Sequence, residues 1–540
     1  MANEYETDYE VGQHNVRFFG FEVHNPVFFV ASILIIVLVV FTLAFQQQAA
    51  AIFEEALNIV TSRFGWLMAS LANFFVLFSI ALIVSPYGSV RLGGPDARPD
   101  FGYMAWFAML FAAGMGIGLV FFGVSEPISH FSASFAADAG GPASYSPLGG
   151  APGDAAASKQ LGMAATIFHW TLHPWAVYVI VGLALALFSY NFGLPLTIRS
   201  GFYPIFGDLV WGTLGNVIDG VALVATVFGL ATSLGFGAQQ SLAGLNFLFG
   251  LEINAVNQVI LVFVIASITL LSLFLGLDRG VRRLSEINMA LAAMLCLFVV
   301  AAGPTVMILL DFPKNIAAYI GKLPALSNMF GRSDKLFYHD WTIFYWAWWT
   351  AWAPFVGMFI ARISRGRTVR EFVFYVLLVP SIVSTFWFTA FGTVAIDQIV
   401  THGYNGAAEA KLPLKLFFML EELPLTQITS VIGITLVLIF FVTSWDSGAL
   451  VLDTIAAGGK IDTHKLQRVF WVGIVGSVAI ALLLGGGLRS LQSGANVTGL
   501  PFMIVVAVMC VGVVKGLHEA RRRQRRLQDT FRSEEEGASP

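Results

Sequence analysis

The chain has 540 residues, 57% of them hydrophobic and 12% charged, with a formal net charge of −3. A soluble globular chain is about half apolar and about a quarter charged, so this composition excludes a protein that water solvates over most of its surface. The small net charge gives no field that would attract nucleic acid. The two cysteines, Cys296 and Cys510, lie in apolar segments and indicate neither a disulfide framework nor a metal site.

The first 26 residues are expected to form a solvated cytoplasmic tail. Glu4, Glu6, Asp8 and Glu10 precede the first apolar stretch, unlike the positively charged start of a cleavable signal peptide. We therefore expect the first apolar stretch to be retained.

Twelve apolar stretches follow along the chain. A hydrocarbon core of about 30 Å needs about 20 apolar residues in a helix to cross it. The stretches begin near Val27, Trp66, Tyr103, Leu161, Val217, Ala255, Ile287, Asp340, Glu371, Thr429, Arg468 and Asn496. The sequence predicts an all-α polytopic membrane protein with twelve transmembrane helices.

Positive residues are concentrated in alternate connections between these stretches. Arginine and lysine remain preferentially on the cytoplasmic side, which places both termini there. The first outer connection then holds only Arg63. Two longer outer connections, around residues 311–335 and 401–425, carry more positive residues, and we expect them to include amphipathic surface helices.

Glycines interrupt the third stretch at Gly114, Gly116 and Gly118. Glycine costs about 1 kcal/mol relative to alanine inside a helix, so this spacing favours unwinding or very close packing. One interpretation is a contact between helices through small residues. The other is a discontinuous helix whose freed carbonyl groups bind a cation at the membrane midplane.

A polar cluster lies in the tenth stretch, at Thr443, Ser444 and Asp446. Ionisable residues inside a membrane are costly and usually functional, although Asp446 can also cap backbone amides. Adjacent hydroxyl groups suit a hard cation such as sodium, which prefers oxygen ligands. The competing interpretation is that the hydroxyl groups bond to their own helix.

Aromatic residues gather at two places in the chain. Trp346, Trp348, Trp349 and Trp352 fall within seven residues, and a second stretch holds Trp170, Trp175 and Tyr178. An isolated tryptophan usually belongs to the aromatic belt at a membrane interface, but the members of the first run point around their helix. Aromatic faces attract cations, and boxes of them recognise quaternary ammonium groups. The clusters therefore predict a site for a small cationic or zwitterionic solute.

Other chemistry is not indicated. His169 and His173 are four residues apart, a spacing that can bind zinc, but no glutamate lies between them and no third ligand is evident. We interpret both as packing or hydrogen-bonding residues. The sequence has no phosphate-binding loop, so energy is expected from an ion gradient, and no pairing of nucleophile and base indicates an enzyme.

Three ordered motifs resemble those of the betaine/carnitine/choline transporter family. They are Gly114-Met-Gly-Ile-Gly-Leu with Glu126-Pro127, His169-Trp-Thr-Leu-His-Pro-Trp with Tyr178, and Trp346-Ala-Trp-Trp-Thr-Ala-Trp-Ala-Pro-Phe-Val-Gly continuing into Arg362-Ile-Ser-Arg-Gly-Arg. The resemblance runs from about Val11 to about Lys515.

The resemblance implies a leucine-transporter-like fold with two inverted five-helix repeats, assembled as a homotrimer in the bacterial inner membrane. The implied divisions are a cytoplasmic N-terminal tail (1–26), two peripheral helices (27–102), a first repeat with the outer loop that follows it (103–337), a second repeat (338–514) and a short cytoplasmic tail (515–540). The basic run near Arg521 is expected to contact anionic lipid.

The resemblance also implies site residues. The onium head is expected among Trp170, Trp175, Tyr178 and Trp349, with Met115 alongside, Trp348 and Trp352 further along the pathway, and gates at Phe121 and Phe344. A sodium site is expected from Ala112, Met115, Phe440, Thr443 and Ser444. A possible second sodium site holds Thr226 and Phe355, but Leu230 stands where a second threonine is expected.

We therefore expect a secondary transporter that imports an osmoprotective solute such as glycine betaine with sodium, by alternating access and without any other cofactor. Gly118 favours this, because proton-coupled choline transporters of the family tend to have aspartate at that position. The alternatives within the family are dimethylsulfoniopropionate transport, proton-coupled choline uptake and carnitine exchange. The alternative of another class is a solute-gated channel or sensor.

Overall fold

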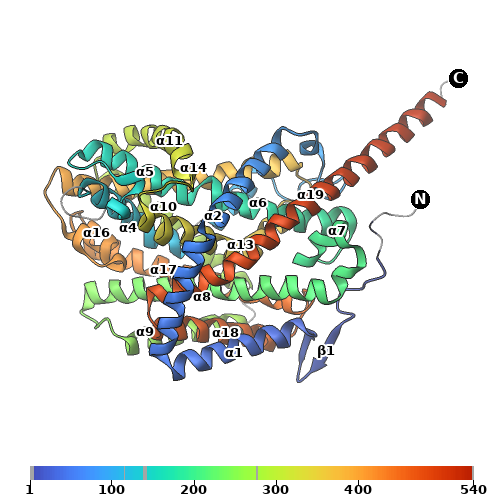
Figure 1. The fold of residues 1–540 in the computed structure, drawn as a ribbon, viewed down its shortest axis with the longest axis horizontal. Helices are drawn as coiled ribbons and strands as arrows, with labels where there is room; N and C mark the ends of the chain where they lie inside the picture. Colours follow the sequence, from blue (N-terminus) through green and yellow to red (C-terminus); the bar gives the residue numbers. More distant parts are fainter. Residues whose placement is uncertain (1–4, 6, 115, 138–142, 275–277, 538–540) are drawn as a thin grey trace.

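The computed structural model describes residues 5, 7–114, 116–137, 143–274 and 278–537, most of them in helices (Figure 1). The longer helices are α1 (Val27–Ala44), α2 (Gln46–Val84), α3 (Tyr103–Gly114), α4 (Ile117–Phe135), α5 (Ala155–Trp170), α6 (Leu172–Ala186), α8 (Thr213–Phe249), α9 (Ala255–Phe274), α10 (Asp278–Ala302), α11 (Thr305–Ser327), α13 (Phe344–Ile363), α14 (Val369–Val400), α17 (Thr426–Ala456), α18 (Lys465–Leu484) and α19 (Leu488–Gly537). Shorter elements are the strands β1 (Asn15–Phe18) and β2 (Phe21–His24) and the helices α7 (Tyr203–Phe206), α12 (Lys335–Phe337), α15 (Gly406–Glu409) and α16 (Lys415–Glu421).

Membrane-spanning helices account for most of the chain. In the described ranges ten helices are long and apolar enough to cross a membrane, and α3 with α4 forms a bent pair that counts as an eleventh. Helix α13 occupies the stretch expected near Asp340, but its tryptophans and tyrosine make it less apolar than an aliphatic span. An all-α polytopic membrane protein is therefore confirmed, whereas the number twelve stays a prediction.

The second helix was predicted to begin near Trp66, and that boundary is wrong. Helix α2 begins at Gln46, and only Phe45 separates it from α1. Arg63, expected in the first outer connection, therefore lies inside a helix. The N-terminal part of α2 is amphipathic, so a search for apolar windows passes over it, yet it buries the stripe Ala49, Phe53, Leu57 and Val60.

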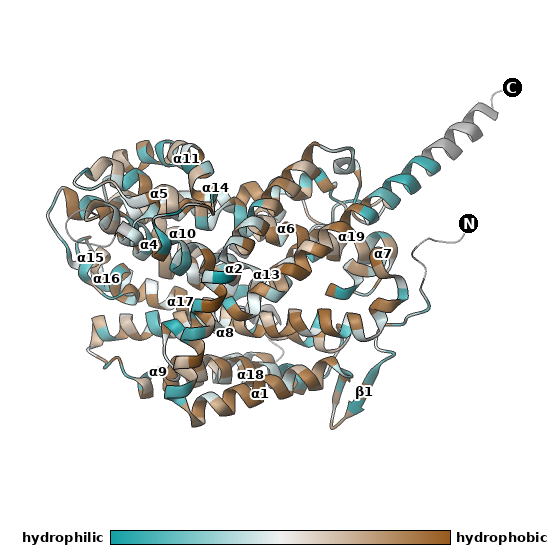
Figure 2. Ribbon diagram, in the orientation of Figure 1, coloured by the Kyte–Doolittle hydropathy of each residue, from teal (hydrophilic) through white to brown (hydrophobic). Residues whose placement is uncertain are grey.

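The helices divide into an inner and an outer group. The apolar window of the α5–α6 segment is 94% buried and that of α8 is 78% buried, whereas those of α9 and α10 are each 28% buried. Helix α13 packs against α6, α8 and α19. Figure 2 shows hydrophobic residues along the long helices and hydrophilic residues on α19 where it extends beyond the other helices. Polar chemistry inside the bundle therefore has to lie on the inner helices.

The N-terminal tail is not wholly solvated, contrary to expectation. Strands β1 and β2 form an antiparallel hairpin in which Asn15 pairs with His24. Val23 and His24 are buried, and the Lys460 Nζ lies 2.6 Å from Glu22 Oε1. The Lys460 ammonium holds the pKa of Glu22 below its usual value. The hairpin is thus held by contacts with residues more than 400 positions away in the sequence. The charges along the tail do not reveal such contacts.

The two longer connections, which we expected on the outer side, contain helices as predicted. Helix α11 lies in the first of them and α16 in the second. Helix α11 packs against α5 and α14 and buries Ile308, Asn315 and Tyr319, while Leu309 and Lys314 remain exposed. Helix α11 thus packs along α5, and α16 packs against α4 and α17.

Candidate functional site

The third apolar stretch is broken at its glycines. Helices α3 and α4 meet at an angle of 66°, and Gly116 between them is in an extended conformation with φ −158° and ψ −178°. The interruption agrees with the discontinuous helix that the spacing allowed. Met115, expected at both the solute and the sodium site, lies outside the described residues.

A second break separates α5 from α6 at Thr171. Its φ of −119° and ψ of −115° are far from helical values. His169 and His173 flank the break and do not share one helical face: His169 Nδ1 lies 2.6 Å from Glu126 Oε1, and His173 Nε2 lies 3.0 Å from Asn73 Oδ1. Both are hydrogen-bonding residues, as interpreted, but the absence of a further ligand near His169 was wrong, because Glu126 and His130 lie within 4.8 Å of it.

Trp349 is the centre of an aromatic cluster. The centroid of its ring system lies 4.8 Å from that of Trp170, 4.9 Å from Trp348, 5.9 Å from Tyr345 and 6.3 Å from Tyr178. We call these five residues the aromatic box. Trp349 is half-buried, whereas the other four are buried. The break at Thr171 and the packing of α13 on α6 bring residues from three helices into this cluster.

Two members of the tryptophan run lie outside the box. Trp346 stacks on His173, with ring centroids 4.8 Å apart, and contacts Phe168 at 5.1 Å. Trp352 lies one turn beyond Trp349, where its Nε1 donates to the Gly229 carbonyl at 2.8 Å. Trp175 reaches the box through Tyr178, with ring centroids 5.3 Å apart. Tyr345 was not predicted as a site residue, because a single tyrosine beside a run of tryptophans has no pattern of its own in the sequence.

Both predicted gate residues contact one ring of α8. Phe236 lies 5.2 Å from Phe121 and 6.0 Å from Phe344 between ring centroids. Phe344 also stacks on Trp348 at 5.5 Å. Phe344 therefore adjoins the box, and Phe121 reaches it through Phe236, which packs on Trp348 at 5.3 Å and which the sequence did not single out.

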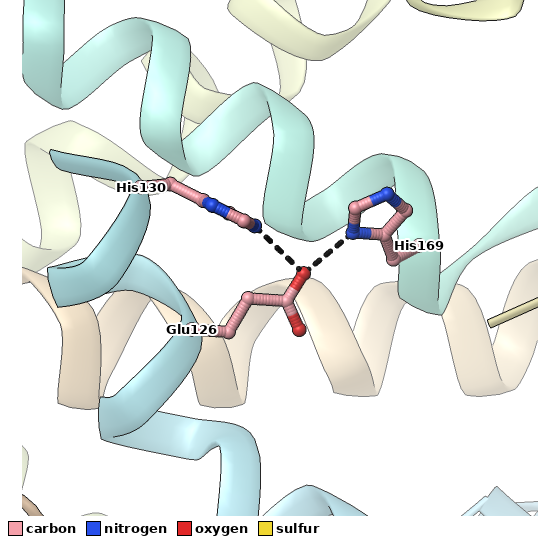
Figure 3. A group of neighbouring side chains, drawn as sticks. All are labelled: Glu126, His130 and His169. Atoms are coloured by element: carbon pink, nitrogen blue, oxygen red, sulfur yellow. Dashed lines mark hydrogen bonds and ion pairs between the residues drawn. The ribbon is translucent and has the colours of Figure 1, made fainter. Parts of the chain in front are cut away.

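A buried carboxylate lies behind the box. Glu126 of α4 is fully buried, and its Oε1 lies 2.6 Å from His169 Nδ1 and 3.3 Å from His130 Nε2 (Figure 3). Its Oε2 accepts from Trp170 Nε1 at 2.7 Å and from the Tyr345 hydroxyl at 2.5 Å. The sequence carried a signal for Glu126, because it is an ionisable side chain within an apolar stretch. Glu126 was named only as part of a family motif and not as a site residue.

The described residues expected at the first sodium site lie on α3 and α17. Thr443 is buried, and its hydroxyl donates to the Ile439 carbonyl at 2.9 Å. A hydroxyl that donates keeps its lone pairs for a cation, so this bond is compatible with a ligand role. A β-carbon on Gly237 of α8 would meet both Phe441 and Ile117, so α17 lies close to the start of α4. Ala112, Phe440 and Ser444 are the other described members of the expected set.

The second expected sodium site has one hydroxyl in the described structure. The Thr226 hydroxyl donates to the Ala222 carbonyl at 2.7 Å, and the Phe355 ring packs on Trp352 at 5.3 Å. Leu230, one turn from Thr226, packs against Gly448, where a β-carbon would lie 2.5 Å from Leu230 Cδ1. An apolar side chain thus fills the position where an oxygen ligand was expected.

The long apolar helices, the two breaks and the buried aromatic box define a multi-pass membrane transporter. Residues 26–522 match the model of the family described as BCCT, betaine/carnitine/choline family transporter, and the chain belongs to that family. It is a transporter and not an enzyme.

Relatives match over nearly the whole chain. A glycine betaine/proline/choline transporter of Vibrio parahaemolyticus is 55% identical over 528 residues, which cover 96% of each chain. The glycine betaine transporter 1 of the same organism is 46% identical, covering 96% of this chain and 98% of its own length. A glycine betaine transporter of Bacillus subtilis is 42% identical, covering 87% of this chain and 90% of its own.

Proposed function

We propose that this chain imports a quaternary-ammonium compatible solute of the glycine betaine type, coupled to sodium, by alternating access. The observation that carries the proposal is the aromatic box around Trp349. Three relatives, at 55%, 46% and 42% identity, have glycine betaine in their names.

The three indole N–H groups of the box are already engaged within the protein. Trp170 Nε1 donates to Glu126 at 2.7 Å, Trp348 Nε1 to the Ser233 hydroxyl at 3.2 Å, and Trp349 Nε1 to the His169 carbonyl at 2.9 Å. The three indoles would therefore bind a solute through their aromatic faces and not as donors. A trimethylammonium head has no hydrogen-bonding group and carries diffuse charge, so it fits such faces, which attract cations by about 2 kcal/mol each when desolvated.

Two features support sodium as the coupling ion. The Thr443 hydroxyl is a hard oxygen ligand in a buried part of α17, and the break between α3 and α4 leaves carbonyl groups without helical partners nearby. Gly118 carries no carboxylate that would accept a proton at the box. With Leu230 at the second position, we propose one sodium ion per solute.

The surroundings follow from the same proposal. The chain would lie in the bacterial inner membrane with both termini in the cytoplasm and would assemble as a homotrimer of two-repeat subunits. The exposed apolar side chains of α9 and α10, such as Phe263 and Leu297, face lipid or a neighbouring subunit in this arrangement.

Uptake by the full chain in liposomes tests the proposal. We expect labelled glycine betaine to accumulate under an inward sodium gradient and not when potassium replaces sodium. Trp349→Ala is expected to abolish uptake, and Thr443→Ala with Ser444→Ala to raise the sodium concentration needed. Thr454→Ala is the matched control, because its hydroxyl makes the same bond to the carbonyl four residues earlier, Leu450, at 2.8 Å.

The same assay separates the alternatives. Equal uptake in potassium would refute sodium coupling, and uptake that never exceeds equilibration would favour a channel or sensor. Competition by choline, proline, carnitine and dimethylsulfoniopropionate ranks the solutes. Choline and proline belong in the set because the relative at 55% identity has both in its name.

A further inference from the structure

Glu126 joins α4, which supplies no residue of the aromatic box, to two of the three helices that build it. It lies on α4, and its partners His169 and Trp170 lie at the end of α5 while Tyr345 lies on α13. Glu126, His169 and Tyr345 each have an exposed fraction of 0%. A buried carboxylate without partners costs several kcal/mol, and the two donors Trp170 and Tyr345 and the two histidine nitrogens around Glu126 offset that cost.

The cluster of Glu126, His130 and His169 also has the composition of a metal site, since one ligand atom of each lies within 4.8 Å of the others. The hydrogen bonds disfavour that interpretation. Trp170 Nε1 is only a donor, so it fixes Oε2 as an acceptor, and Oε1 already lies 2.6 Å from His169 Nδ1. His169 Nε2 is directed to the Thr342 hydroxyl at 3.0 Å. The geometry is that of a carboxylate surrounded by donors.

The same bonds set the orientation of two walls of the box. Trp170 meets Trp349 edge to face at 79°, and the ring of Tyr345 stacks on Trp349 at 18°. Each ring is bonded at its polar edge to Glu126 Oε2, and each ring contacts Trp349. A single oxygen atom thus holds two aromatic faces at a fixed angle to each other.

The charge of Glu126 acts on the same rings. An indole N–H and a phenol O–H that donate to an ionised carboxylate become more electron-rich, and the negative charge lies directly behind them. Both effects attract a cationic head more than a neutral head of the same shape. No carboxylate needs to touch the solute for this to happen.

We propose that Glu126 is a positioning residue of the solute site, which fixes Trp170 and Tyr345 and makes the box selective for a positive head. The proposal rests on the proposed function, since it assumes that the box binds an onium group. It adds a residue that determines charge selectivity from behind the binding surface.

Glycine betaine and 3,3-dimethylbutanoate test the proposal, because they have the same shape and carboxylate and differ in whether nitrogen or carbon bears the three methyl groups. Binding of both is measured by tryptophan fluorescence on purified wild type and Glu126→Gln. We expect the Kd of betaine to rise about tenfold or more in the variant, and that of the neutral-headed analogue by less than about threefold. A role in packing alone would weaken both equally, and that result, or no change in either, would overturn the proposal.

Tyr345→Phe gives an independent test that does not depend on recovery of the Glu126 variant. It removes one donor and keeps the charge, so we expect a smaller rise in the betaine Kd, and an unchanged Kd would overturn the proposal. His173→Gln is the control. His173 is also a buried hydrogen-bonding residue, but it bonds to Asn73 and packs on Trp346, away from the box. If wild type itself binds no betaine, the proposed function fails and this inference with it. If wild type binds and the variants match it, only the role of Glu126 fails.

Discussion

Gly118 lies directly against the indole of Trp348: a β-carbon at this glycine would be 2.7 Å from Trp348 Cη2, and it would be 2.9 Å from Trp170 Cη2. Both distances are shorter than real contacts of a β-carbon. The last glycine of the broken helix therefore packs between two walls of the aromatic box. The glycine spacing allowed either close packing or a discontinuous helix. The structure shows both at this motif.

Gly118→Ala is expected to reduce the affinity for betaine by about tenfold or more, because the added methyl group must displace one of two tightly packed indoles. The measurement is betaine uptake and its half-saturation in liposomes. Gly116→Ala is the matched control, since a β-carbon there has nothing within 4 Å. Equal effects of the two substitutions would show that backbone freedom and not packing explains the motif.

Trp349→Ala and Trp346→Ala should differ, although the two residues are three apart on α13. Trp349 contacts four aromatic rings of the box, whereas Trp346 stacks on His173 and contacts Phe168. We expect Trp349→Ala to abolish betaine binding and Trp346→Ala to lower stability by about 3–5 kcal/mol with little change in the betaine Kd. Fluorescence titration and thermal unfolding separate the two effects. A loss of binding in purified, folded Trp346→Ala would contradict the assignment of its face.

Leu230→Thr is expected to supply the oxygen ligand that the second sodium site lacks. Residue 230 is one turn from Thr226, so the two hydroxyl groups would lie on one face of α8. Sodium dependence of uptake should become steeper, with a Hill coefficient moving from about one toward about two. Leu230→Ala controls for the space that opens beside Gly448. Unchanged steepness in the threonine variant would argue against a second site here.

Lys415, in the connection between α14 and α17, is expected to make stability depend on pH. Burial lowers the pKa of this amine from 10.5 to about 8, and its Nζ donates to the carbonyl groups of Ala407 and Ala408 at 3.1 and 2.7 Å. Because the folded pKa lies below the unfolded one, charging the amine costs more in the folded state. This group's contribution to stability is therefore fully present above pH 10.5 and is lost as the pH falls to about 8.

Lys415→Met tests this dependence, since it keeps the length of the side chain and removes the titration. We expect the melting temperature of the variant minus that of wild type to be larger at pH 7 than at pH 10, where more of the wild-type amine is neutral. Lys411→Met, in an exposed position of the same connection, is the control. An equal difference at both pH values would show that Lys415 does not titrate in this range.

Sequence alone determined the class of this protein. Apolar stretches of about 20 residues have few stable environments other than a bilayer, so composition and length predicted a polytopic membrane protein before any contact was known. The tryptophan motif around Trp349 and the glycines around Gly118 then indicated the family. The match of residues 26–522 to the family model confirms it. Both signals are local in the chain, which is why they could be read from it.

Only the tertiary structure decided which side chains work together. The break at Thr171 separates His169 from His173, and the packing of α13 on α6 turns Trp349 into the box and Trp346 away from it. Tyr345 donates a hydrogen bond to Glu126 from 219 positions away, and Lys460 donates one to Glu22 from 438 positions away. Periodicity and hydropathy describe one helix at a time. Partners brought together by helix packing have no such local pattern, so only the folded chain places a carboxylate behind the aromatic box.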